Sequence, residues 1–330
     1  MKNLLLPIIF TLFFTSVINA QSCLPDGITF TSQSQIDSFP VNYPGCTVIA
    51  GDVTIREDIG GDIIRLDSLY PITTIEGNLQ IGMFQPFSLP NGNDSLLNLS
   101  GLQNLTSIGG DFDIIENNAL TSLSGLSDSL TSIGGRLVIT RNHALTSLNG
   151  LECIKSIGGS LQIGRYYNTG EGSYPFGNAS LTSLTGLDSL TSVGGDFDVI
   201  GNGALNSLSG LDSLTSIEGN LWIQYNLALT SLSGLSDSLT SIGGDLRISF
   251  NDTLTSLSGL ENLTSIGGDL FIRENNSLTS LSGLDNLTSI GGDLRISFND
   301  TLTSLSGLDS FMTIIGGMLN RKNDVLTNSV

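Results

Sequence analysis

Apolar residues recur every third position along most of the chain. Residues 254–266 show the pattern clearly, and Leu270 and Ile272 then alternate with polar or variable neighbours. Alternation with a period of two is typical of a half-buried strand. A helix could use the three-residue spacing, but glycine and serine interrupt every turn, and β-branched threonine occupies the outer positions. The pattern therefore predicts short extended segments with leucine and isoleucine pointing inward.

This unit returns about every 24 or 25 residues. An Ile-Gly-Gly triplet or a close variant marks eleven copies, from residues 49–51 to residues 315–317. Paired glycines before each strand suit a tight bend with positive φ. Each unit is then one coil of three short extended segments. A single coil buries too few side chains to offset the backbone entropy of ordering it, so we expect stability to come from stacking.

A polar position also repeats, three residues after the buried Ile or Val of the strand. It is asparagine in seven coils: Asn117, Asn142, Asn202, Asn226, Asn251, Asn275 and Asn299. Asparagine tolerates left-handed turns and bonds nearby backbone. Stacked asparagines would satisfy the backbone groups of each bend. We interpret this ladder as architecture rather than catalytic machinery. Together the patterns predict an all-β fold, a parallel β-helix or leucine-rich solenoid of about eleven coils.

The opening of the array carries a family resemblance. Residues 45–55, Gly-Cys-Thr-Val-Ile-Ala-Gly-Asp-Val-Thr-Ile, are followed by repeated Leu-Thr-Ser-Ile-Gly-Gly-Asp-Leu-x-Ile. Over about residues 45–325 the chain resembles the receptor L domain, which forms the ligand-binding lobes of insulin-type and EGF-type receptors. Similar stretches occur in secreted bacterial leucine-rich proteins and fungal cell-wall glycoproteins. The resemblance implies a right-handed β-helix. No furin-like region, transmembrane helix or kinase is evident, so receptor signalling is not predicted.

The N-terminus is typical of a secretory signal. Lys2 precedes an apolar run over residues 4–18, and Ala20 suits a signal peptidase. We expect a signal peptide at residues 1–20, a capping segment at 21–44 and the solenoid at 45–330, with an incomplete last repeat. The predicted location is extracellular or at the cell surface. That compartment permits a disulfide between Cys23 and Cys46, which leaves Cys153 as a half-exposed free thiol.

Charge and chemistry narrow the function. The net charge of −19 makes nucleic acid and anionic membranes poor partners. The i,i+2 pairs Asp111/Asp113 and Asp196/Asp198 could hold Ca²⁺, although a solvated acidic strand face is the favoured interpretation. His143 has no acidic partner nearby in sequence. We therefore predict no catalytic residue, metal or cofactor. A β-helical polysaccharide-degrading enzyme and a purely structural surface rod are the alternatives.

Two insertions follow the strand of their coils and project from one edge. They span residues 82–94 and 164–178. Their aromatic residues are Phe84 and Phe87 in the first, and Tyr166, Tyr167, Tyr174 and Phe176 in the second. Insertions at one repeat position often serve binding. The alternative is that these aromatic side chains fold back over their own loops.

The strongest binding prediction lies on the strands themselves. The outward residue between the two buried strand residues is, in successive coils, Asp198, Trp222, Arg247, Phe271 and Arg295. The position two after the buried isoleucine is Tyr225, Phe250, Glu274 and Phe298, with Arg273 beside them. Stacking would give an aromatic–arginine column, either a ladder that stiffens the sheet or a ligand surface. Such a surface suits sugar rings bearing carboxylates, or an acidic protein patch. We therefore predict a non-catalytic binding or adhesion module for a glycan or protein.

Overall fold

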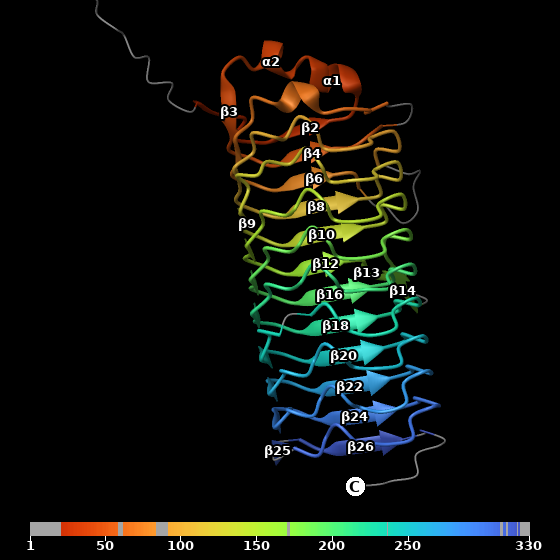
Figure 1. Ribbon diagram of the computed structural model, residues 1–330. Helices are drawn as coiled ribbons and strands as arrows, with labels where there is room; N and C mark the ends of the chain where they lie inside the picture. Colours follow the sequence, from red (N-terminus) through yellow and green to blue (C-terminus); the bar gives the residue numbers. More distant parts are fainter. Residues whose placement is uncertain are drawn as a thin grey trace, which may run out of the picture.

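The chain folds into a nearly all-β solenoid, as the sequence predicts. The computed structural model describes residues 21–58, 62–83, 92–169, 172–235, 237–310, 313–314, 316–321 and 323. These residues form one elongated stack of coils, with the two short helices at one end and β26 at the other (Figure 1). Within the described part of the chain, no helix has the length and apolar character needed to cross a membrane. The predicted signal peptide, Phe84 and Phe87 lie outside the described residues.

Two parallel sheets of twelve strands each run along the stack. The narrow sheet consists of β1 (Gln21–Cys23), β3 (Cys46–Ile49), β5 (Thr74–Ile75), β7 (Ser107–Ile108), β9 (Ser132–Ile133), β11 (Ser156–Ile157), β15 (Ser192–Val193), β17 (Ser216–Ile217), β19 (Ser241–Ile242), β21 (Ser265–Ile266), β23 (Ser289–Ile290) and β25 (Thr313–Ile314). The broad sheet consists of β2 (Ile28–Phe30), β4 (Val53–Ile55), β6 (Leu79–Ile81), β8 (Phe112–Ile115), β10 (Leu137–Thr140), β12 (Leu161–Ile163), β16 (Phe197–Ile200), β18 (Leu221–Gln224), β20 (Leu246–Ser249), β22 (Leu270–Arg273), β24 (Leu294–Ser297) and β26 (Met318–Arg321). Each strand of these sheets pairs with its equivalent in every neighbouring coil, because one coil alone has no partner for its backbone.

The third segment of each coil differs from the prediction. We expected it to be extended, but in the described residues it consists of turns with isolated bridges such as Leu102↔Leu126 and Leu211↔Leu235. Its leucines still point inward and are buried. The glycine in its Leu-Ser-Gly-Leu motif has a positive φ, for example 109° at Gly259, and this turns the backbone away from a strand.

The predicted reason for the paired glycines is also wrong. Gly267 and Gly268 are not among the residues with positive φ. They are required by close stacking instead. A Cβ on Gly267 would collide with the carbonyl oxygen of Gly243 in the preceding coil, and one on Gly268 with the carboxylate of Asp245. Neighbouring coils therefore approach closely at this bend, and glycine is usual there, although Glu76 and Glu218 replace the first glycine in two coils.

The asparagine ladder satisfies buried backbone groups, as predicted. Asn251 is fully buried. Its Nδ2 donates to the carbonyl of Ile223 at 2.9 Å, and its Oδ1 accepts the backbone N–H of Asn226 at 3.0 Å. Asn93 and Asn178, which end the two insertions, continue the same ladder. Each asparagine thus links its own coil to its neighbours.

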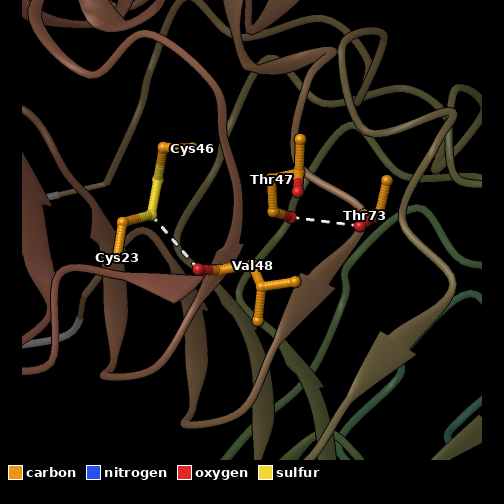
Figure 2. Close-up of a disulfide and its surroundings, with 5 residues drawn as sticks. All are labelled: Cys23, Cys46, Thr47, Val48 and Thr73. Carbon is orange, nitrogen blue, oxygen red and sulfur yellow. Dashed lines mark hydrogen bonds between the residues drawn. A yellow bond between two sulfur atoms is a disulfide. The ribbon is translucent and has the colours of Figure 1, made fainter. Parts of the chain in front are cut away.

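The segment predicted as a cap does more than cover the first coil. Residues 21–44 contribute β1 and β2, the first strand of each sheet, together with α1 (Gln33–Asp37) and α2 (Phe39–Asn42). The short 3-10 helix η1 (Asp67–Leu69) lies against both helices. Cys23 and Cys46 form a disulfide with their Cα atoms 5.8 Å apart, and it ties β1 to β3 (Figure 2). Cys153 is free and half-buried.

Candidate functional site

The second insertion is a β-hairpin that lies beside the broad sheet. Its strands, β13 (Arg165–Thr169) and β14 (Gly172–Phe176), pair antiparallel and project from the stack halfway along it (Figure 1). Strand β13 packs against β16. The hydroxyl of Thr140 on β10 donates to the carbonyl of Phe176 at 2.7 Å. The hairpin is therefore attached to the sheet and forms a wall beside the strands that follow it.

The outward column predicted on the broad sheet is present in the expected register. Trp222 pairs with Arg247, Arg247 with Phe271, and Phe271 with Arg295 on consecutive parallel strands. The Arg247 guanidinium lies 5.2 Å from the centre of the Trp222 ring and 4.5 Å from that of Phe271. Arg295 lies 5.1 Å from the Phe271 ring and pairs with Asp293 at 2.6 Å. Aromatic and guanidinium groups therefore alternate along the surface.

A second column runs along the turn that follows each strand. Tyr225 and Phe250 stack with ring centres 4.3 Å apart and planes 11° from parallel. Arg273 lies 5.8 Å from the Phe250 ring and 5.1 Å from the Phe298 ring, and it pairs with Glu274 at 2.6 Å. The two columns are side by side, because each turn continues directly from its strand.

The residues of the turn column adopt a left-handed backbone. Tyr225, Phe250, Glu274 and Phe298 have φ of 58°, 59°, 53° and 58°. At the equivalent turns of earlier coils, Gly201, Glu116 and Arg141 adopt the same conformation, with φ of 73°, 61° and 60°. For a bulky residue the left-handed region costs about 1–2 kcal/mol, and strained positions of this kind concentrate at functional sites.

Tyr166 of the hairpin joins these columns into a groove. Its ring packs edge-on against Tyr225 with centres 5.8 Å apart, and its hydroxyl donates to Oε1 of Gln224 at 2.7 Å. Burial raises the pKa of the Tyr166 hydroxyl, so it is neutral at ordinary pH. The groove has a volume of about 550 Å³. It is lined by Tyr166, Trp222, Gln224, Tyr225, Arg247, Ser249, Phe250, Phe271 and Arg273.

The other predicted site residues lie outside the groove. Tyr167 packs on Phe176 with ring centres 6.2 Å apart, and Arg141 lies 4.6 Å from the Phe176 ring. These two aromatic residues thus pack at the base of the hairpin. Tyr174 is 50% exposed on the same hairpin. Arg295 and Phe298 extend the two columns beyond the groove.

A smaller pocket lies on the other side of Tyr166. Its volume is about 260 Å³, and its lining consists of Gln162, Arg165, Tyr166, Asp198, Ile200 and Trp222. Asp198 is only 5% exposed. Gln162 donates to its Oδ2 at 2.9 Å, whereas its Oδ1 has no hydrogen-bond partner. Burial raises the pKa of Asp198 to about 6, against the hydrogen bond from Gln162, which lowers it.

The structure corrects the interpretation of the two carboxylate pairs. They do not form a solvated acidic face, because Asp113 and Asp198 are buried. Their partners Asp111 and Asp196 accept backbone N–H groups of the next coil, from Arg136 at 2.9 Å and Asn220 at 2.8 Å. These carboxylates are therefore engaged in linking coils. No group of three or more His, Cys, Asp or Glu side chains that could hold a metal ion occurs among the described residues.

Sequence reasoning missed the polar floor of the site. Gln224 and Ser249 are the fourth residues of β18 and β20, and both are buried. The Gln224 Nε2 donates to Oγ of Ser249 at 2.6 Å. Strand alternation indicates that these side chains point outward with Trp222 and Arg247, and that signal could have placed them. Tyr166 of the hairpin covers Gln224, a tertiary contact that the local pattern does not reveal.

Comparison with known proteins agrees with the resemblance seen in the sequence. The family model for the receptor L domain matches residues 240–329, which include β20, β22 and β24 of the broad sheet. No curated protein and no solved structure matches the chain. The matched residues contain Arg247, Phe250, Phe271 and Arg273 of the groove. The C-terminal coils of this solenoid are thus similar to the receptor L domain, a ligand-binding module of extracellular proteins.

Proposed function

We propose that the protein is a non-catalytic, extracellular binding module that recognises a glycan in the groove beside Tyr166. The observation that carries the proposal is the convergence of two aromatic–arginine columns and a hairpin on one groove of about 550 Å³. Half-buried rings of Trp222, Tyr225 and Phe250 offer flat apolar faces, while Gln224 and Arg247 supply hydrogen-bonding groups. Apolar walls with a few placed polar groups are typical of ligand sites.

The left-handed aromatic residues support binding over a purely structural role. Glu116 and Arg141 hold the same left-handed conformation at the equivalent turns of the first half, so the turn itself does not require an aromatic ring at Tyr225 or Phe250. The strain is offset in part by their stacking, which is worth about 0.5–1.5 kcal/mol. A half-exposed aromatic strip in a chain of net charge −19 is explained more simply by a ligand that covers it.

The lining of the groove argues against glycoside hydrolysis. That reaction ordinarily uses two carboxyl groups facing each other across the bond that breaks. None of the residues that line the groove carries a carboxylate. Asp198, in the smaller pocket beyond Tyr166, is a single buried acid. We therefore favour recognition over hydrolysis.

A double substitution tests the proposal. The secreted protein is applied to an array of neutral and acidic glycans, and Trp222→Ser with Arg247→Ser is applied in parallel. We expect lost capture with little change in melting temperature, because both side chains are half-buried and point outward. The matched control is Thr54→Ser with Gln80→Ser, at the same outward column of β4 and β6. Unchanged capture by the double variant, or release of reducing ends from a bound glycan, would overturn the proposal.

A further inference from the structure

The arginines of this chain differ in how they are paired. Of those whose side chains the structure describes, six form an ion pair with a carboxylate: Arg56, Arg65, Arg136, Arg141, Arg273 and Arg295. The other two, Arg165 and Arg247, form none. The chain carries 31 acidic and 12 basic residues, so carboxylates are abundant. Two arginines left without one are therefore a feature to explain.

Both of these arginines lie beside Tyr166. Arg165 lines the smaller pocket and Arg247 lines the groove, while Tyr166 lines both. The strands beneath them, β12, β16, β18 and β20, are consecutive in the broad sheet. Three strand spacings separate β12 from β20, or about 14 Å. The two cationic positions are thus set apart along one continuous surface, with an aromatic ring between them.

The surroundings of each arginine favour an anion. The Trp222 and Phe271 rings flank Arg247 and its Nε has no hydrogen-bond partner, so the guanidinium plane is held while its terminal nitrogens remain available. A fixed guanidinium matches a carboxylate with two parallel hydrogen bonds. At Arg165 burial lowers the pKa, opposed mainly by the charge of Asp113, and the buried carboxyl of Asp198 lines the same pocket without forming an ion pair with Arg165. A partly buried charge without an ion-pair partner is stabilised by an incoming anion.

We propose that the two pockets together bind an acidic polysaccharide, with one sugar carboxylate on Arg247, a second on Arg165 and a sugar ring against Tyr166. This inference rests on the proposed function and names its ligand class. A stiff chain that carries carboxylates at regular intervals matches two cationic positions fixed on a rigid sheet. An acidic peptide would have to order long, flexible side chains to reach both, which disfavours it.

Oligomers of galacturonic acid of increasing length test this arrangement by titration calorimetry with the whole secreted chain. Arg247→Gln should weaken binding of every length by about tenfold to a hundredfold, the effect of losing a charged hydrogen-bonded pair. Arg165→Gln should bind short oligomers like the wild type. It should weaken binding by a similar factor only for oligomers long enough to reach both arginines. The matched control, Arg56→Gln, removes the same charge from an ion pair outside both pockets and should change nothing.

Several outcomes would overturn the inference. These are equal affinity for neutral oligomers of the same length, tighter binding of oligoglutamate than of oligogalacturonate, or an Arg165→Gln effect that is absent or the same at every length. Sulfated oligomers form a further arm: if they bind and carboxylated ones do not, the carboxylate assignment fails. Capture of a neutral glycan that is lost in the Trp222→Ser, Arg247→Ser variant would leave the proposed function standing and remove only this inference.

Discussion

The outer face of the broad sheet changes character halfway along the solenoid, whereas the inner face does not. From β4 to β12 the outward column is Thr54, Gln80, Asp113, Val138 and Gln162, and from β18 to β24 it is Trp222, Arg247, Phe271 and Arg295. Inward residues are leucine, isoleucine, valine or phenylalanine in both halves. The hairpin β13–β14 stands at the boundary.

Some positions of the repeat are required by the fold, and others are free to vary. Stacking and the asparagine ladder require the inward residues, most of the glycine pairs and the asparagines, so these recur in both halves. The outward column is free to vary, because a threonine or a tryptophan there pairs its backbone equally well. An unusual outward residue therefore carries information about function that an unusual inward residue would not.

The largest loss of stability is expected from the asparagine ladder, which should be alike in both halves of the solenoid. Asn117→Ala and Asn251→Ala each leave buried backbone groups unpaired, and each should lower the free energy of unfolding by about 3–5 kcal/mol. Urea denaturation monitored by circular dichroism measures both. Costs that differ by several kcal/mol between the halves would show that the interior is not uniform and would weaken the comparison.

The fold could be predicted from the sequence because the same pattern of apolar, glycine and asparagine positions recurs in most coils. Leu254 to Ile272 alone suggests a coil, and its recurrence removes the helical alternative. The disulfide and the outward register of Trp222, Arg247 and Phe271 could also be anticipated. These features depend on spacing along the chain, which the sequence contains.

The groove could be predicted only in part. The hairpin was evident as an insertion, but its direction depends on Thr140, β16 and other distant contacts. That direction brings Tyr166 to Tyr225 and sends Tyr174 into solvent. The hairpin also covers Asp198, although strand alternation alone predicts that this side chain is exposed. Tertiary contacts of this kind leave no periodic signal.

A smaller, pH-dependent effect on stability is expected from the buried side chains of Asp113 and Asp198. Asp198 has a pKa raised by burial to about 6, and Asp196, just before the same strand, adds to this, while Arg165 and a neutral Tyr166 line the same pocket from the hairpin. A raised pKa means that the folded state holds the proton more tightly than the unfolded state. Stability from this group therefore rises as pH falls from about 6 toward 3.8, by up to about 3 kcal/mol.

The measurement is the difference between wild type and Asp198→Asn. Relative to this variant, the wild type should gain stability between neutral and acidic pH, and at pH 7 the variant should be at least as stable. Burial also raises the pKa of Asp113, but Arg136 pairs with it at 3.0 Å and opposes the rise, so Asp113→Asn should show the same sign of pH dependence with a smaller size. A pH-independent difference for Asp198→Asn would show that its carboxyl is not desolvated as the structure indicates.

The smallest effect on stability is expected at the left-handed turns, and it separates the functional from the structural interpretation of the aromatic half. Phe250→Gly relieves about 1–2 kcal/mol of backbone strain but removes the stack on Tyr225 and the contact with Arg273. These terms nearly cancel, so the free energy of unfolding should change by no more than about 1 kcal/mol, while glycan capture falls. Glu116→Gly is the matched control at the equivalent turn after β8, since it relieves the same strain outside the groove while losing an ion pair with Arg141, and it should retain capture. If Phe250→Gly instead lowers stability by several kcal/mol and Glu116→Gly does not, the aromatic residues hold the coils together, and the contrast between the two halves is one of packing rather than of binding.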